Sequence, residues 1–229
     1  RQRQMCIRDR DSAREKGASL FYKYQYSINE QDNVIWKNRM LFAAIFDYRN
    51  KIDRATYDAG IKIDEKNLPF KVERYFHMAV MGASRSYKLW REDNWKYLLQ
   101  ERHQQDGLSV YLTWGNDKER KAAESLAAQL GFVKVLPRLR LKEIAVLLSL
   151  SRSLVAVDTG LLHLANALNL PTVGIYPKTS VNNTRTEGRD YQLIVGGEAA
   201  LSPQLVSQEW KKALAYKLRE INDENTGSN

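Results

Sequence analysis

The sequence predicts an α/β fold in which a parallel, Rossmann-like sheet is covered by helices on both faces. From about residue 70 onward, short segments that are almost entirely apolar alternate with helical segments. Strands of this kind are typical of parallel sheets that are buried on both faces. Polar loops follow three of these strands and lead directly into helices. These observations together predict one Rossmann-like domain over residues 70–200.

The individual elements follow from the spacing of apolar residues. Residues 18–60 are rich in aromatic and charged residues, and apolar positions near helical spacing predict helices there. Pro69 favours extended structure, which predicts a linker over Asn67–Val72. Strands are then expected at Tyr75–Met81, Ser109–Thr113, Val133–Leu136, Leu154–Val157, Thr172–Tyr176 and Gln192–Val195. Helices are expected at Glu92–Gln105, Lys118–Leu130, Leu141–Leu150, Leu161–Leu168 and Pro203–Ile221.

The two ends of the chain differ from the rest in composition. The opening stretch RQRQMCIRDR has four arginines and one aspartate and shows no amphipathic period. Residues 1–17 are therefore expected to be a non-native or disordered tail that takes no part in the fold. Residues 201–229 are expected to form a C-terminal helix followed by a polar tail.

Composition and charge limit the classes of function. The net charge of +9 favours an anionic partner, although a solvated surface accounts for most single Lys and Arg residues. Cys6 is the single cysteine, so an internal disulfide is excluded and a reducing compartment is compatible. No apolar run approaches the length of a membrane span, and the start has no secretory signal pattern. We therefore expect a soluble, cytoplasmic protein.

The segment of residues 153–180 predicts an anion-binding site. A buried strand delivers Asp158, Thr159 and Gly160 directly into a helix, whose first backbone N–H groups have no partner within the helix. Gly160 allows close approach, and Asp158 and His163 add polar groups at the same end. The expected occupant is a phosphorylated ligand. Two plainer interpretations stay open, in which Thr159 only caps the helix and His163 is only a partly buried histidine.

Motifs of the commonest nucleotide-binding classes are absent from the sequence. It has neither a GxGxxG fingerprint nor a GxxxxGK[ST] phosphate loop. Their absence argues against an NAD-type domain and against a P-loop NTPase.

The loop at residues 81–95 also follows a predicted strand. Its Ser84, Arg85 and Lys88 supply hydroxyl, guanidinium and ammonium donors that suit a diphosphate. The alternative is an ordinary solvated loop, with Trp90 and Trp95 as anchors in the core. Both interpretations stay open, and Trp95 is expected to be a packing residue.

The loop at residues 112–124 carries the third polar strand end. Gly115 permits a tight turn, and Asn116 or Asp117 suits the cap of the following helix. Glu119 lies early in that helix, at the rim where a ribose would present its hydroxyls. The alternative is that Glu119 only interacts favourably with the helix dipole. Ligands of open α/β sheets bind beyond the carboxyl ends of the strands, so the three loops are expected to share one rim.

Five segments of the chain resemble a known family. GASRSYKLW, WGNDKERKAAESLA, VLPRLRLKEIAVLL and VAVDTGLLHLANALNLPTVGIY are similar to the C-terminal half of the lipopolysaccharide heptosyltransferases, which are glycosyltransferase family 9 enzymes of the GT-B fold. The SRxxKxW form at Ser84–Trp90 looks closer to the heptosyltransferase I branch than to the heptosyltransferase II branch. ASLFYKYQYSI resembles the end of the family's N-terminal domain. The resemblance covers residues 18 to about 220 and implies a remnant of the acceptor domain with bridging helices at 18–69, followed by the donor domain at 70–200.

The resemblance implies transfer of L-glycero-D-manno-heptose from ADP-heptose to the Kdo-lipid A inner core. It further implies inversion at the anomeric carbon, no metal and no cofactor. Such an enzyme would work in the cytoplasm, with peripheral contact at the cytoplasmic face of the inner membrane. Nucleic acid is not an expected partner.

The resemblance also implies roles for residues around the donor diphosphate. Lys88 corresponds to the lysine that contacts the donor phosphates and stabilises the leaving group, and Ser84 to a hydroxyl residue that assists it. Thr159, Gly160 and His163 correspond to residues that line the diphosphate.

Two acidic residues correspond to family positions on the sugars, and one family residue has no counterpart. Glu119 corresponds to the acidic residue near the donor ribose, and Asp158 to the one that reaches the heptose hydroxyls. The family's general base is an aspartate in the first strand-loop unit of its N-terminal domain, and nothing in residues 1–60 matches it. The base is therefore unknown, and we expect a fragment that lacks most of the acceptor domain. Ala83 stands where the family often has a second hydroxyl.

Two other functions stay open at this stage. One is a different GT-B transferase or a sugar epimerase that uses a UDP- or GDP-sugar. The other is a basic module that binds nucleic acid, for which FYKYQY is the favourable segment. The basic residues elsewhere are scattered among acidic ones, which argues against this module.

Overall fold

The computed structural model describes residues 26, 34–51, 59–64, 68–178, 189–197 and 201–226. The chain divides into two compact units, residues 1–57 with 182–187 and residues 58–181 with 188–229. The expected tail at residues 1–17 lies outside the described residues.

The described part of the first unit is mainly one helix, α1 (Val34–Ile45), followed by the short 3-10 helix η2 (Arg49–Lys51). The sequence of α1 contains neither glycine nor proline, and it ends before Asp47, whose φ of 56° is left-handed. Helices were expected within residues 18–60, and α1 lies in that range. The rest of that expectation falls largely on residues outside the described part.

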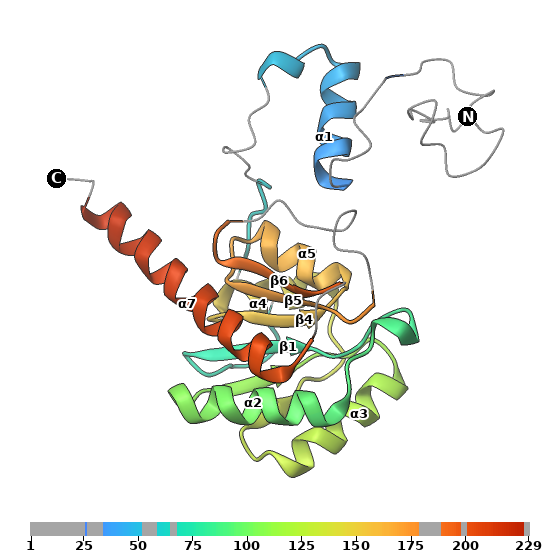
Figure 1. Cartoon of the computed structure of the whole chain (residues 1–229), viewed down its shortest axis with the longest axis vertical. Coiled ribbons are helices and arrows are strands. Elements are labelled where there is room, and N and C mark those ends of the chain that lie inside the picture. Colours follow the sequence, from blue (N-terminus) through green and yellow to red (C-terminus); the bar gives the residue numbers. More distant parts are fainter. Residues whose placement is uncertain are drawn as a thin grey trace. The chain divides into compact units, whose positions relative to one another are not determined.

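The second unit contains a six-stranded parallel sheet with the order β3-β2-β1-β4-β5-β6 (Figure 1). Its strands are β1 (Phe76–Val80), β2 (Ser109–Leu112), β3 (Val133–Val135), β4 (Leu154–Val157), β5 (Thr172–Tyr176) and β6 (Gln192–Gly196). The strand order reverses between β1 and β4, which lie side by side. Open α/β sheets bind ligands at this kind of switch point, beyond the carboxyl ends of the strands.

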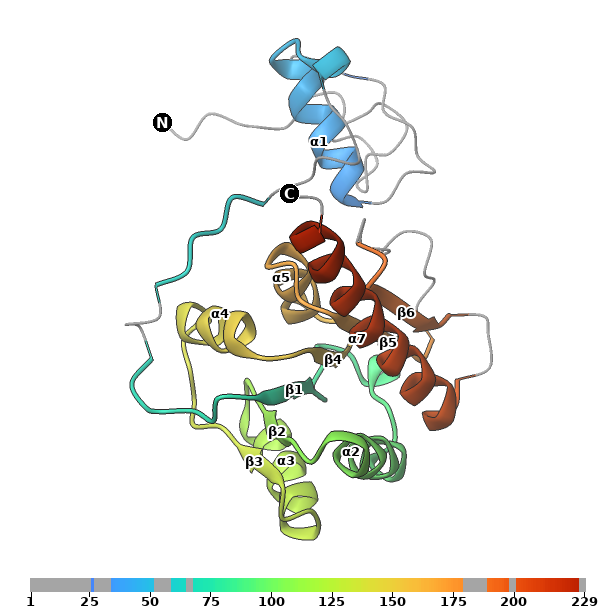
Figure 2. The same cartoon turned by 90° about the vertical axis from the view of Figure 1, so that its left-hand side faces the viewer.

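Helices cover both faces of this sheet, as the sequence predicts (Figure 2). They are α2 (Glu92–Asp106), α3 (Asp117–Gln129), α4 (Leu141–Leu150), α5 (Gly160–Ala167) and α7 (Pro203–Thr226). One core contains α2, α3 and α7, with Trp95 and Trp210 fully buried. The other contains α4 and α5, with Leu147 and Leu162 buried against the sheet.

The expected boundaries differ from the observed ones by small amounts that have local causes. Helix α2 ends where Gly107 adopts a left-handed φ of 71° and donates its N–H to the carbonyl of His103. Strand β1 omits Tyr75, which is 46% exposed and whose ring centroid lies 5.1 Å from the guanidinium carbon of Arg74 and 5.0 Å from that of Arg152. Helix α7 continues to Thr226, five residues beyond the expected end at Ile221.

A buried polar network joins the amino-terminal ends of β1 and β4 to α2 and α7. His77 Nδ1 lies 2.7 Å from Ser153 Oγ, and His77 Nε2 lies 2.9 Å from Asp106 Oδ2. Trp210 donates its indole N–H to Ser153 Oγ at 2.6 Å. The bonds are mutually consistent when Ser153 donates to His77 Nδ1 and a neutral His77 donates to Asp106. The network lies at the end of the sheet opposite the switch-point rim.

Candidate functional site

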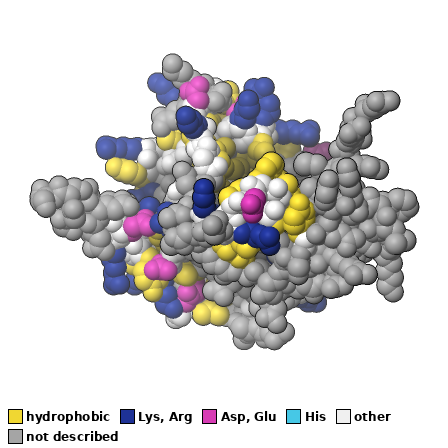
Figure 3. Space-filling model, turned by 90° about the horizontal axis from the view of Figure 1, so that it is seen from above, with side chains coloured by type: hydrophobic (Ala, Val, Ile, Leu, Met, Phe, Trp, Pro, Cys, Tyr) yellow, Lys and Arg dark blue, Asp and Glu magenta, His cyan; other side chains and the backbone are white. Residues whose placement is uncertain are grey.

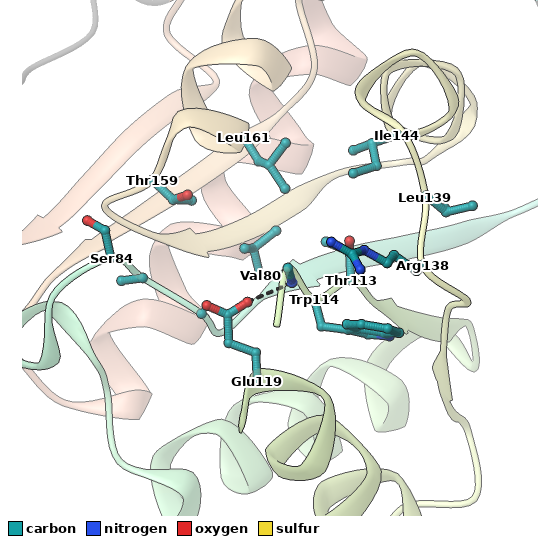
Figure 4. A pocket seen from close by; sticks show the side chains of 13 residues that line it. Val80, Ser84, Thr113, Trp114, Glu119, Arg138, Leu139, Ile144, Thr159 and Leu161 are labelled. Carbon is teal, nitrogen blue, oxygen red and sulfur yellow. Dashed lines mark hydrogen bonds between the residues drawn. The ribbon is translucent and has the colours of Figure 1, made fainter. Parts of the chain in front are cut away.

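A pocket of about 310 Å³ opens at the carboxyl ends of four strands, on both sides of the β1–β4 switch point (Figure 4). Its walls come from the loops after β1, β2, β3 and β4 together with the first residues of α4 and α5. It is lined by Val80, Gly82, Ala83, Ser84, Thr113, Trp114, Gly115, Glu119, Arg138, Leu139, Ile144, Thr159 and Leu161.

The loop after β1 carries the first predicted site residues. Ser84 is exposed and lines the pocket. The 3-10 helix η4 (Ser86–Lys88) follows it, and Lys88 Nζ reaches Asp158 Oδ2 at 2.7 Å. Trp90 and Trp95 are both buried, with their rings edge to face at 5.4 Å. Trp95 is therefore a packing residue as expected, and Trp90 is an anchor in the core, as the alternative interpretation of this loop had it. These anchors hold the loop whose short helix places Lys88 beside β4.

The turn between β4 and α5 carries the second group. The backbone N–H of Asp158 donates to the carbonyl of Ile175, which fixes the turn to the end of β5. Thr159 has the extended backbone of an N-cap residue, yet its side chain makes no capping hydrogen bond. Its hydroxyl therefore does not serve the helix, and the side chain lies on the pocket wall (Figure 4). Gly160 is exposed and is the first residue of α5.

His163 lies one turn into α5, near the Lys88–Asp158 pair. Burial lowers the pKa of His163 below its ordinary value of 6.5; the carboxylate of Asp158 opposes this shift, and the charge of Lys88 adds to it. The imidazole is therefore mostly neutral at pH 7, with one donor and one acceptor nitrogen.

Glu119 projects from the first turn of α3 towards the loop after β1 (Figure 4). Its Oε2 accepts the backbone N–H of Gly115 at 2.7 Å, and its own N–H donates to Asn116 Oδ1 at 3.0 Å. Asn116 is thus the cap of α3, one of the two residues expected for that role. The contacts stabilise the start of the helix and also hold the Glu119 carboxylate on the pocket wall.

The structure brings the predicted residues together in two adjoining groups. Ser84, Glu119 and Thr159 line the pocket, whereas Lys88 and Asp158 form an ion pair beside it. The side chains of this pair are 19% and 6% exposed, respectively.

Other pocket residues were not singled out from the sequence. Arg138 and Leu139 follow β3, and Trp114 follows β2 and donates its indole N–H to the carbonyl of Leu136 at 2.7 Å. Arg138 and Leu139 follow from the rule that ligands of open α/β sheets bind beyond the carboxyl ends of the strands, because β3 ends at the same rim as β1, β2 and β4. Ile144 of α4 and Leu161 of α5 add apolar surface to the pocket. The helical spacing of apolar residues alone assigns both side chains to the core.

The described residues contain neither a candidate metal site nor a candidate membrane-spanning helix. Within them no cluster of three or more His, Cys, Asp or Glu side chains is arranged to hold a metal ion. None of the helices in the same part of the chain is both long enough and apolar enough to cross a membrane.

The fold and the pocket define a Rossmann-like α/β domain with a pocket of polar and apolar residues at its topological switch point. The family model of glycosyltransferase family 9 (heptosyltransferase) matches residues 2–214, and the chain belongs to this family. The resemblance noted from the sequence motifs is therefore confirmed.

Individual relatives agree with this assignment. The chain is 36% identical to lipopolysaccharide heptosyltransferase 1 of Pseudomonas aeruginosa over 214 residues, which cover 91% of this chain and 56% of the relative. It is 33% identical to the protein of the same name from Escherichia coli K12 over 171 residues, which cover 75% of this chain and 53% of the relative. The chain thus spans about half the length of the curated relatives it matches.

Solved structures show the same fold. The E. coli heptosyltransferase WaaC with ADP matches with a TM-score of 0.69 and 26% identity, over 91% of this chain and 66% of that one. WaaC with ADP-2-deoxy-2-fluoro heptose matches with a TM-score of 0.64 and 27% identity, over 95% and 64% of the two chains. The six-stranded parallel sheet of this chain is therefore that of a GT-B glycosyltransferase domain.

Proposed function

We propose that this chain is the donor-binding part of a heptosyltransferase, which transfers L-glycero-D-manno-heptose from ADP-heptose to the Kdo-lipid A inner core. The observation that carries the proposal is the pocket at the β1–β4 switch point, with the Lys88–Asp158 pair at its border. A nucleoside diphosphate needs a cationic donor, backbone N–H groups and acceptors for its ribose, and the described site contains all three. The solved WaaC structures with ADP and with a heptose analogue of the donor support this choice of ligand.

Lys88 has the main electrostatic role in the proposed reaction. When the bond between heptose and the diphosphate breaks, negative charge grows on the departing phosphate oxygens. The ammonium of Lys88 and the N–H groups at the start of α5 would stabilise this charge without a metal. Asp158 holds Lys88 at the pocket border and offsets its charge before the donor binds. The largely neutral His163 is suited to donate a hydrogen bond to an oxygen of the diphosphate.

The pocket separates into polar and apolar parts that suit the rest of the donor. Glu119 on one side has acceptor oxygens for the ribose hydroxyls. Leu139, Ile144 and Leu161 form an apolar wall of the kind that packs against a purine ring. Asp158 would reach the heptose hydroxyls, and Ser84, Thr159 and Gly160 would contact the diphosphate. We assign the role of general base to no residue of this chain.

The acceptor and the cellular location belong to the same proposal. Kdo-lipid A is embedded in a membrane, so the enzyme would work in the cytoplasm with peripheral contact at the inner membrane. On the face visible in Figure 3, the described Lys and Arg side chains are interspersed with acidic and hydrophobic ones. A nucleic-acid module is typically marked by a basic patch or stripe, so this face does not favour one.

Competitive calorimetry tests the donor. ADP and ADP-heptose should bind the chain, and UDP- and GDP-sugars at the same concentration should leave the ADP isotherm unchanged. Displacement of ADP by a UDP-sugar would favour another transferase or an epimerase. Absence of any ADP binding would overturn the proposal.

A further inference from the structure

Gly82 and Glu119 approach each other too closely for a side chain at position 82. Gly82 lies in the loop after β1, and the Glu119 carboxylate reaches it from α3 across the pocket wall. A Cβ atom at position 82 would lie 2.6 Å from Oε2 and 2.7 Å from Oε1 of Glu119. Both distances are well inside van der Waals contact, so any side chain at position 82 would displace the carboxylate.

Space, and not backbone conformation, is the reason for glycine at this position. The glycines with left-handed φ in the described residues are Gly60, Gly107, Gly196 and Gly197, and Gly82 is not among them. An alanine therefore fits the backbone at position 82 and conflicts only with the end of a flexible side chain. The rest of the fold has no reason to move.

The other contacts of Glu119 leave part of its carboxylate available. Oε2 accepts the N–H of Gly115, whereas Oε1 accepts no hydrogen bond from any residue in the described part of the chain. An ionised carboxylate has about four acceptor positions. This one can therefore accept further hydrogen bonds from a ligand while it stays bound to Gly115.

We infer that Gly82 is a positioning residue, which sets the nucleotide specificity of the site by leaving the space in which the Glu119 carboxylate stands. The inference rests on the proposed function, because the ligand group that Glu119 would accept is the vicinal diol of a ribose. Gly82 need not touch the ligand. An added methyl group turns the carboxylate out of this space and breaks its bond to Gly115, so the ribose hydroxyls lose their acceptor.

The test compares ADP with 2′-deoxy-ADP by calorimetry on the wild-type chain and on Gly82→Ala. The wild type should prefer ADP. Gly82→Ala should lower the affinity for ADP by about tenfold, as expected for loss of a hydrogen bond to a charged group, and lower that for 2′-deoxy-ADP, which keeps only the 3′-hydroxyl, by a clearly smaller factor. Gly131→Ala is the matched control, because a Cβ there meets no described atom within 4 Å. It should leave both affinities unchanged.

A double variant shows whether Gly82→Ala changes ADP affinity through the Glu119 carboxylate or by direct contact with the ligand. In a Glu119→Ala background the methyl group at position 82 has no carboxylate to displace, so Gly82→Ala should add less than about a twofold change in ADP affinity. This variant also remains informative if Gly82→Ala alone fails to fold. The role of Gly82 would be overturned if the two substitutions had additive effects on the free energy of ADP binding, or if Gly82→Ala lowered the affinities for ADP and for 2′-deoxy-ADP by the same factor. In either case, ADP binding by the wild type would still uphold the proposed function. A wild type that binds no ADP would overturn both.

Discussion

Lys88 Nζ lies 2.7 Å from Asp158 Oδ2, and this ion pair joins the loop after β1 to the turn after β4. The two strands are neighbours at the switch point, so the pair spans the place where the strand order reverses. Its side chains are largely withdrawn from water, which makes their interaction stronger than that of a surface pair. An anionic ligand that enters here meets a cation already held in position.

Lys88→Ala should weaken ADP binding by about tenfold or more, because a charge-assisted contact to the diphosphate is lost. Calorimetry with ADP measures the effect. Lys96→Ala is the control, since Lys96 Nζ donates to Gln129 on the α2–α3 surface. Unchanged ADP affinity in a folded Lys88→Ala chain would remove Lys88 from the site.

Asp158→Asn should weaken the binding of the heptose and leave the binding of the nucleotide largely unchanged. The amide keeps the size of the side chain and releases Lys88 from its ion pair, so ADP affinity should stay within about twofold or increase. The preference for ADP-heptose over ADP should fall, because a charged acceptor for the heptose hydroxyls is lost. Parallel titrations with the two ligands measure this preference. Complete loss of ADP binding would contradict the role given to Asp158.

Much of the fold could be predicted from the sequence, because strand and helix signals are local. The apolar run Leu154–Val157 between Ser153 and Asp158 predicts β4 with the bounds observed. It was also predictable that the polar loops after β1, β2 and β4 share one rim, where the structure has a pocket, because parallel strands end at one edge. The Lys88–Asp158 pair and the Gly82–Glu119 approach were not predictable from spacing. Each depends on the side-chain directions of two loops that only the folded sheet brings together.

Ser153→Ala should destabilise the fold by about 1–3 kcal/mol, although Ser153 is far from the rim. Its hydroxyl is buried and serves both His77 and Trp210, so its removal leaves two buried polar groups without this partner. Urea unfolding measures the change in the free energy of unfolding. Ser149→Ala, at an exposed position near the end of α4, is the control and should stay within about 0.5 kcal/mol. Equal effects of the two substitutions would exclude a stabilising role for the network.

His77 should make stability depend on pH. Burial lowers the pKa of His77 below its ordinary 6.5, and the hydrogen bond to Asp106 opposes this only in part, with smaller effects from Arg102 and Arg152. Below about pH 6.5, His77 therefore binds a proton in the unfolded chain more readily than in the folded chain. The free energy of unfolding should fall as the pH drops from about 7 to about 5 and be constant above about pH 7.5.

His77→Gln should reduce the slope of this pH dependence. His163 also has a lowered pKa, so part of the slope should remain until His163→Gln is added. Urea unfolding between about pH 5 and 8 measures the slopes and stays above the range in which carboxylates titrate. A slope that is the same in the wild type and in His77→Gln would show that His77 is protonated alike in both states.

Gly160→Ala should weaken ADP binding without destabilising the fold. A Cβ at position 160 meets no atom of the described residues within 4 Å, and the backbone there is not left-handed. Alanine at the first position of α5 should therefore keep or raise the melting temperature, because it has less conformational freedom in the unfolded chain. ADP affinity should nevertheless fall, since the methyl group occupies the approach to the first N–H groups of the helix.

Gly131→Ala, which has equal space but lies away from the rim, should bind ADP as the wild type does. If Gly160→Ala also binds ADP normally, the diphosphate does not lie against the start of α5.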